Sequence, residues 1–203
     1  MISRGNRPGE GAVISVLRQQ TPGVSGTTSL TFHIDLGTAP VPERRYVADV
    51  CNVGLSHEGA RIVFGQSKVS EDGLRSLVIV HMSANGIHQF LNSAPDMLRI
   101  ASEYMKRSKL TAGRLSDIDN EPNQTIALAA NLIAASFSAT EACMDFYYAS
   151  PFVVQQVKAG GDFAADPVVR VSMPMILMYA ICEKLKEIKD RLPTLESVQE
   201  QEI

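Results

Sequence analysis

An apolar run that changes into a helical pattern occurs twice in this chain, at residues 75–91 (RSLVIVHMSANGIHQFL) and 167–188 (PVVRVSMPMILMYAICEKLKEI). In each copy the run ends at a residue suited to a helix start. Ser83 can cap the first turn through its hydroxyl, and Pro174 fits the first turn because its missing amide has no helical partner there. A strand that leads into a helix, present twice, predicts the α+β class with two related units.

Further strands are predicted in front of each strand–helix pair. Residues 30–36 alternate apolar and polar side chains, while 46–55 and 60–66 are mostly apolar and are bounded by turn signals. In the second half, residues 142–148 predict a strand. Residues 125–137 are ambiguous, because their alanine content favours a helix whereas their alignment with the first half favours a strand at the end.

The two halves align with one another as an internal repeat. The early part aligns at a shift of 82 residues and the later part at a shift of 91, so the second copy carries nine extra residues between Phe146 and Val168. Matched residues share apolar character: Ala48 with Ala130, Val50 with Leu132, Ile62 with Met144, Phe64 with Phe146, Val80 with Val171, and Met82 with Met173. Few matches are identities, so chance similarity is the alternative. A three-stranded antiparallel meander with one helix is marginal alone, and we therefore expect the two tandem units to cover each other as a pseudo-twofold pair.

Composition divides the chain into five segments. Residues 1–27 contain several glycines and prolines and predict a flexible N-terminal arm, with a short strand conceivable at its centre. The first sheet-plus-helix unit is expected at 28–110, followed by a polar linker at 111–123. The second unit is expected at 124–193, and an acidic tail at 194–203.

Short motifs in both halves resemble those of a small bacterial family of unknown function. The family pattern is tyrosine-alanine-asparagine, then leucine-aspartate-phenylalanine-glycine at the end of a strand, then valine-x-methionine-serine-proline before a helix. The matching residues are Ala48-Asp49, Phe64-Gly65-Gln66 and Val80-His81-Met82-Ser83 in the first half, and Ala130-Asn131, Met144-Asp145-Phe146 and Val171-Ser172-Met173-Pro174 in the second. The resemblance covers about residues 46–107 and 128–192. Each half departs from the pattern. The first has Asp49 in place of the asparagine and lacks the aspartate and the proline, and the second lacks the glycine.

This family is similar in layout to the SecB export chaperone, an antiparallel sheet with helices packed on one face. The resemblance therefore implies a SecB-like fold in two copies. It implies no specific activity, because none is established for the family, and a chaperone-like role follows from layout alone.

Charge and composition limit the classes of binding partner and the cellular compartment that we expect. A net charge of -3 and a pI near 5.8 argue against nucleic acid, which needs concentrated positive charge. No apolar run is long enough to span a membrane, and the N-terminus lacks the apolar centre of a secretory signal, so we expect a cytoplasmic protein. Cys51, Cys143 and Cys182 lie among apolar residues and are interpreted as buried free thiols.

Residues with catalytic or metal-binding chemistry do not form a recognised motif. His81 and His88 lie seven residues apart with no third ligand at metal-site spacing, so we expect no metal and no cofactor. The sequence Ser56-His57-Glu58 is typical of a turn, because catalytic groups meet across a fold rather than as neighbours. The glycine-rich segments match neither a Walker loop nor a dinucleotide fingerprint.

Methionine and aromatic residues are the one feature that indicates binding. They form adaptable apolar surfaces, and the candidate partner-binding residues are Phe146, Tyr147, Tyr148, Met173, Met175, Met178 and Tyr179. Packing between the halves is the alternative. We therefore expect a non-enzymatic protein- or polypeptide-binding module that forms homo-oligomers. A structural or regulatory subunit that recognises one folded partner is the second hypothesis, and an enzyme the third.

Overall fold

The computed structural model describes residues 12–18, 28–34, 39–67, 74–93, 99, 102–103, 106–107, 125–138, 140–150 and 165–192. Within these residues the elements are β1 (Ala12–Arg18), β2 (Thr28–Ile34), β3 (Arg45–Val47), β4 (Val50–Ser56), β5 (Gly59–Ser67), β6 (Leu74–Ser83), α1 (Ala84–Ser93), β7 (Ile126–Ala130), β8 (Leu132–Phe137), β9 (Glu141–Tyr148), β10 (Asp166–Pro174) and α4 (Met175–Lys189). The protein is therefore α+β, as the sequence predicts.

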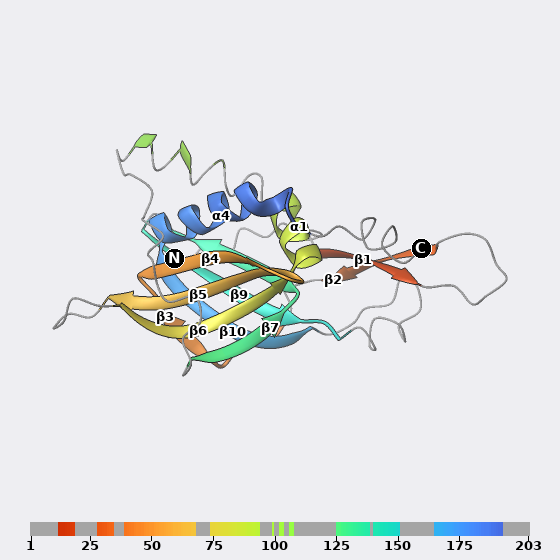
Figure 1. Ribbon diagram of the computed structural model, residues 1–203, viewed down its shortest axis with the longest axis horizontal. Helices are drawn as coiled ribbons and strands as arrows, with labels where there is room; N and C mark the ends of the chain where they lie inside the picture. Colours follow the sequence, from red (N-terminus) through yellow and green to blue (C-terminus); the bar gives the residue numbers. More distant parts are fainter. Residues whose placement is uncertain are drawn as a thin grey trace.

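Two four-stranded sheets carry the fold (Figure 1). The first sheet has the order β4-β5-β6-β7 and the second the order β3-β10-β9-β8. Both are antiparallel except for one pair each, because β7 runs parallel to β6 and β3 runs parallel to β10. In each sheet one of the two end strands, β7 in the first and β3 in the second, comes from the other half of the chain. The expected three-stranded meander thus gains a fourth strand by exchange between the halves.

Two sharp corners in the chain make this exchange possible. The strand expected at 46–55 is divided at Ala48 and Asp49 into β3 and β4, and the ambiguous segment at 125–137 is divided at Asn131 into β7 and β8. Strands that bend at a corner can serve two sheets in turn. Ala48 and Ala130 are buried in the core at the two corners.

The pairing of both sheets follows the repeat found in the sequence. Val50 lies opposite Gly65 in the first sheet, and their counterparts Leu132 and Tyr147 lie opposite one another in the second. The parallel pairs also correspond, since Leu128 lies opposite Val80 and Tyr46 opposite Val171. Each sheet also has a register shift at the matched place. The shift lies between Phe64 and Gly65 in the first sheet, and between Pro167 and Val169, the partner of Phe146, in the second.

The helix starts are held by the hairpin turns. The predicted cap is confirmed, because the Ser83 hydroxyl oxygen accepts a hydrogen bond of 3.1 Å from the Gly86 N–H. The first amide of α1, at Ala84, donates to the carbonyl of Glu58 at 3.0 Å. At the matched place the first amide of α4, at Met175, donates to the carbonyl of Thr140, also at 3.0 Å. Pro174 directly precedes α4 and provides no side-chain cap.

The core lies between the two sheets and beneath the helices (Figure 1). Side chains at every second position of β5 and β9 point into it, which is the strand periodicity. The predicted apolar face of α4 is buried there too: Leu177, Ile181, Leu185 and Ile188. Burying each of these large apolar side chains stabilises the fold by roughly 1.5–3 kcal/mol.

One glycine is required by a close approach of the backbone. A Cβ atom on Gly59 would lie 2.0 Å from the carbonyl oxygen of Met82 and 2.6 Å from the amide nitrogen of Ala84. β5 therefore begins directly against the junction of β6 and α1, and only glycine allows this contact.

β1 and β2 form a separate antiparallel pair, with Val13 opposite His33. β1 is the part of the expected N-terminal arm that the structure describes, and it is a strand. β2 corresponds to the strand expected at 30–36. The rest of the expected arm at 1–27, the linker at 111–123 and the tail at 194–203 lie outside the described residues.

Candidate interaction surface

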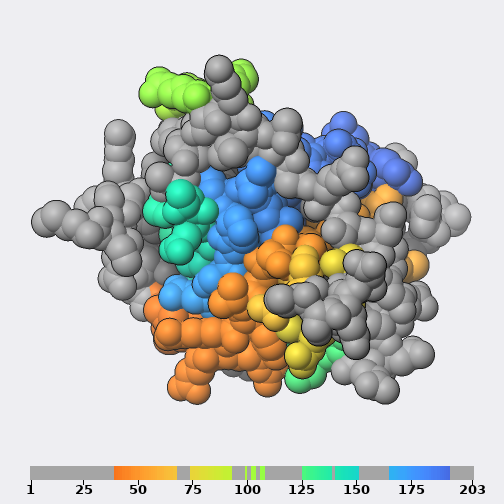
Figure 2. Space-filling model, turned by 90° about the vertical axis from the view of Figure 1, so that its left-hand side faces the viewer, coloured from red at the N-terminus to blue at the C-terminus, as the bar shows by residue number. Residues whose placement is uncertain are grey.

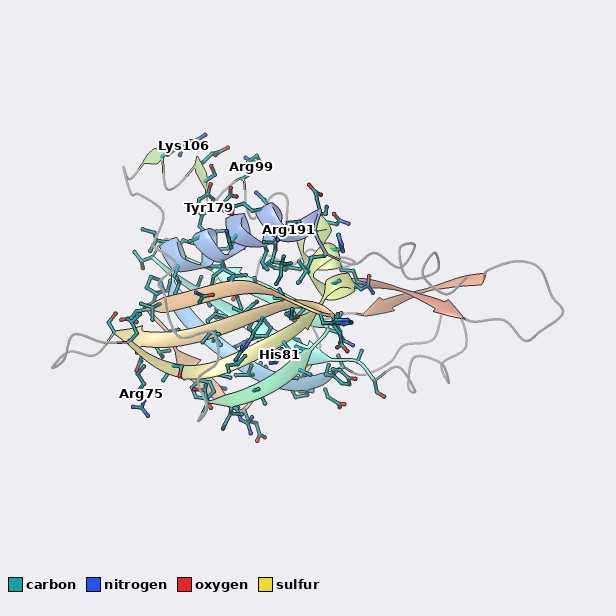
Figure 3. The ribbon with its side chains drawn as sticks, in the orientation of Figure 1. Arg75, His81, Arg99, Lys106, Tyr179 and Arg191 are labelled. Atoms are coloured by element: carbon teal, nitrogen blue, oxygen red, sulfur yellow. The ribbon has the colours of Figure 1, made fainter. Side chains whose placement is uncertain are left out.

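Five of the seven residues expected to bind a partner are buried, which corrects the expectation of an exposed apolar surface. Phe146, Tyr147, Met173, Met175 and Met178 are at most 3% exposed. All but Tyr147 belong to the core between the sheets and α4. This agrees with the alternative that these residues pack between the two halves of the chain. Burial raises the pKa of Tyr147 to about 12. Tyr148 and Tyr179 are half-buried, and Tyr179 lies on α4 (Figure 3).

The two most exposed of the large apolar side chains in the described residues lie instead on the exchanged end strands β3 and β7. Val47 on β3 is 63% exposed and Ile126 on β7 is 51% exposed. Figure 2 shows one end of the molecule, where segments of the two halves lie side by side, the first in orange and yellow and the second in blue and teal. The sequence does not indicate these positions, because both strands form part of longer predicted segments and nothing local places them at a sheet edge.

The end strand β3 carries charged side chains, and the carbonyl of its last residue accepts a hydrogen bond from a side chain. Arg44 and Arg45 are exposed next to Val47. The side-chain amide of Gln66 donates to the Val47 carbonyl at 2.8 Å. Charged side chains and occupied backbone groups are the usual means by which proteins protect a sheet edge.

The end strand β7 has neither feature. Its sequence, Ile-Ala-Leu-Ala-Ala, contains no charged residue and no proline, and Ala127 and Ala129 are exposed. Among the described residues, β7 pairs with no strand other than β6. Within the part of the chain that the structure describes, this strand is therefore an apolar edge without the charge and proline that protect sheet edges.

The two corners are held by matched side chains with different chemistry. Asn131 bonds Ala149 twice: its amide nitrogen donates to the Ala149 carbonyl at 2.8 Å, and its oxygen accepts from the Ala149 N–H at 2.7 Å. Asp49, the counterpart in the first half, accepts from the Ser67 N–H at 2.8 Å. A carboxylate has no donor for a second bond. Asn131 therefore has a structural role at this corner.

The second sheet carries an ion pair on the face turned away from the core. Arg170 donates to both carboxylate oxygens of Asp145, at 2.6 Å and 2.5 Å, from the neighbouring position on the next strand. These hydrogen bonds raise the pKa of Arg170. The counterparts in the first sheet are Val63 and Ile79, which form a small buried apolar cluster with Val50.

The remaining polar residues with catalytic or metal-binding chemistry do not come together in the fold. Ser56, His57 and Glu58 lie around the β4–β5 turn, as predicted, and His81 is exposed on β6 (Figure 3). His88 lies on α1 with its Nε2 atom buried and unbonded. In the described part of the chain, no three His, Cys, Asp or Glu side chains are placed to hold a metal ion together.

Two of the three cysteines are buried as expected. Cys51 and Cys182 are enclosed in the core, where burial raises the pKa of both thiols, that of Cys182 to about 12. Cys143 is only half-buried, and its Sγ atom lies 3.0 Å from the Ser136 hydroxyl.

Neither helix that the structure describes in full, α1 or α4, combines the length and the apolar character that crossing a membrane requires. No protein-family model, no curated protein and no solved structure matches this chain.

Proposed function

We propose that this chain is a non-enzymatic module that binds protein or polypeptide, and that it does so through the edges of its sheets. The observation that carries the proposal is the exposure of large apolar side chains on the two end strands that are exchanged between the halves, Val47 on β3 and Ile126 on β7. Sheet edges offer unpaired backbone N–H and C=O groups, and apolar side chains beside them add a surface that gains from burial. Together they favour a partner that is an extended polypeptide or that has an open strand edge of its own.

The sequence resemblance supports the same class of function. The motifs around Asp49 and Asn131 fall at the two corners, and matched residues occupy matched registers in both sheets. A SecB-like arrangement of two pseudo-twofold units, and association into homo-oligomers, are parts of this proposal. So is a cytoplasmic location, since Cys51 and Cys182 are free thiols and a reducing compartment keeps thiols free.

The proposal is tested with an unfolded polypeptide that cannot refold. Fluorescently labelled α-lactalbumin, reduced and carboxymethylated, is titrated with the protein and followed by fluorescence anisotropy. We expect saturable binding, and we expect weaker binding by the double variant Val47→Lys/Ile126→Lys, because a lysine on each edge opposes strand pairing. Native folded α-lactalbumin is the control. Absence of saturable binding to the unfolded chain contradicts the proposal.

A second candidate function is that of a subunit that recognises one folded partner. It is favoured by β3, where Arg44 and Arg45 are exposed next to the apolar Val47, because arginine beside apolar side chains is enriched at protein interfaces. This function predicts one protein that copurifies in a fixed ratio, together with no affinity for carboxymethylated α-lactalbumin. Affinity purification with mass spectrometry and light scattering distinguishes the two.

A further inference from the structure

The parallel pairing of β3 fixes which of its backbone groups face the open edge. The Arg170 N–H donates to the Arg44 carbonyl and the Ala48 N–H donates to the Ser172 carbonyl, both at 2.9 Å. Backbone groups alternate in direction along a strand, so those of Arg45 and Val47 point away from β10. β7 has the same register on β6. The N–H and C=O groups of Ala127 and Ala129 therefore point to the open edge of the first sheet.

The two open edges differ in what already occupies them. On β3 the Val47 carbonyl is bonded by Gln66, and two arginines lie at the start of the strand. On β7 the residue matched to Gln66 is Tyr148, which lacks the side-chain amide that bonds the Val47 carbonyl on β3. The residues matched to Arg44 and Arg45 are Ile126 and Ala127, which are uncharged. Of these two edges, the one on β7 is thus better suited to a new strand.

We propose that the open edge of β7 binds an extended polypeptide segment as an added strand of the first sheet. This inference rests on the proposed function and deepens it by naming the site and the class of ligand. Two N–H and two C=O groups in strand spacing are satisfied together by another extended backbone, and by neither a helix nor a side-chain cluster.

The side chains of β7 define the ligand further. Ile126 leaves apolar surface exposed on the side of the sheet that faces the core, so apolar residues at alternate positions of the ligand gain by covering it. The other side of the sheet carries the small Ala127 and Ala129 near the exposed His81, and it accepts polar residues. The ligand is therefore a segment in which apolar and polar residues alternate.

The test compares proline substitutions at matched positions of the two end strands. Ala129→Pro and Val47→Pro each remove one amide that points to an open edge, a place where a strand tolerates proline. The probe is a fluorescein-labelled heptapeptide of alternating valine and threonine, followed by anisotropy. We expect Ala129→Pro to weaken binding about tenfold or more, since it removes a hydrogen bond and obstructs the edge. We expect less than about a twofold change for Val47→Pro, because the β3 edge is already occupied.

Hydrogen exchange measured by NMR on the full chain gives an independent measurement. On addition of the heptapeptide, we expect the amides of Ala127 and Ala129 to exchange at least about tenfold more slowly, while the Leu128 amide, already bonded to β6, does not change. Ala127→Lys replaces the proline variant if circular dichroism shows that Ala129→Pro does not fold. The lysine keeps every backbone N–H and C=O group, and its charge at the sheet edge is expected to weaken the binding of an added strand.

Three outcomes overturn the inference. If the wild-type protein binds carboxymethylated α-lactalbumin and the heptapeptide, but both Ala129→Pro and Ala127→Lys bind as well as wild type, the site is wrong and the proposed function stands. If the wild type binds neither probe, the proposed function fails as well. If the wild type binds no heptapeptide and forms dimers that Ala129→Pro dissociates, a second copy of the chain occupies the edge instead.

Discussion

The rings of Phe64 and Phe146 meet edge to face across the core, with centroids 5.8 Å apart and planes at 64°. The two residues are fully buried, one on β5 and the other on β9, and they are matched to one another by the internal repeat. The two halves of the chain therefore contact each other through the same position of their sheets. Edge-to-face pairs of this kind add about 0.5–1.5 kcal/mol beyond the burial of their area.

Truncation of either ring is expected to destabilise the whole molecule. Phe64→Ala and Phe146→Ala each leave a cavity at the contact of the two sheets, and each is expected to lower the free energy of unfolding by about 3–5 kcal/mol. In the double variant the loss should be smaller than the sum by about 1 kcal/mol, since the pair interaction is then counted once. Urea denaturation of the four proteins measures this coupling, and strict additivity contradicts it.

Exchange of the corner residues is expected to affect stability unequally at the two corners. Asn131→Asp loses the donor to the Ala149 carbonyl and places a carboxylate against it, which should cost about 1–3 kcal/mol of stability. Asp49→Asn keeps an acceptor for the Ser67 amide and adds a donor, so we expect a change within about 1 kcal/mol. Guanidinium denaturation at pH 7 compares the two, and equal losses at both corners contradict the role assigned to Asn131.

Replacement of the ion pair by its counterparts from the first sheet is expected to be tolerated. Asp145→Val alone leaves Arg170 unpaired and should destabilise by about 3 kcal/mol, while the double variant Asp145→Val/Arg170→Ile should lie within about 1 kcal/mol of wild type. The reason is that Val63 and Ile79 already pack at the matched positions of the other sheet. Thermal unfolding of the three proteins checks the order, and a double variant weaker than the single one contradicts it.

The glycines of the first sheet provide a matched pair of substitutions. Gly59→Ala forces a Cβ atom against the Met82 carbonyl, and the resulting backbone shift should cost about 3 kcal/mol or more. Gly54→Ala, on the next strand, meets nothing within 4 Å and should change stability by less than about 1 kcal/mol. Chemical denaturation distinguishes them.

Acidification is expected to destabilise the contact between the helices through His88. Its pKa is lowered from 6.5, first by burial and then by the charge of Lys189 on α4, while Asp190 acts in the opposite direction. The unfolded chain therefore binds more protons below pH 6.5, and the free energy of unfolding falls with pH until the folded-state pKa is reached. His88→Gln should flatten this part of the stability profile relative to wild type, and an unchanged profile contradicts the prediction.

Much of the fold follows from local sequence signals. The strand–helix junctions at Ser83 and Pro174 were predicted because a cap and a helix-starting proline follow apolar runs. The register of the two sheets also follows the shifts of 82 and 91 residues found by alignment. These features depend on residues near one another in sequence, or on positions that repeat.

The exchange of end strands and the surface could not be predicted in the same way. Nothing local marks Asn131 as a corner, because the partner of its amide, Ala149, is brought to it by the pairing of β8 with β9. Methionine and aromatic residues indicate either a surface or a core, and the second sheet places Met173 and Phe146 inward. The exposed edge of β7 likewise appears only once its position in the first sheet is known.

The exchanged strands also determine when the molecule can finish folding. Tyr46 pairs with Val171, 125 residues further along the chain, and closing so long a loop is slow. During synthesis on the ribosome, the amino-terminal half emerges with β3 lacking its neighbour until β10 follows. A nascent chain interrupted before Asp166 therefore holds one incomplete sheet, and the native topology is reached only after β10 has been synthesised.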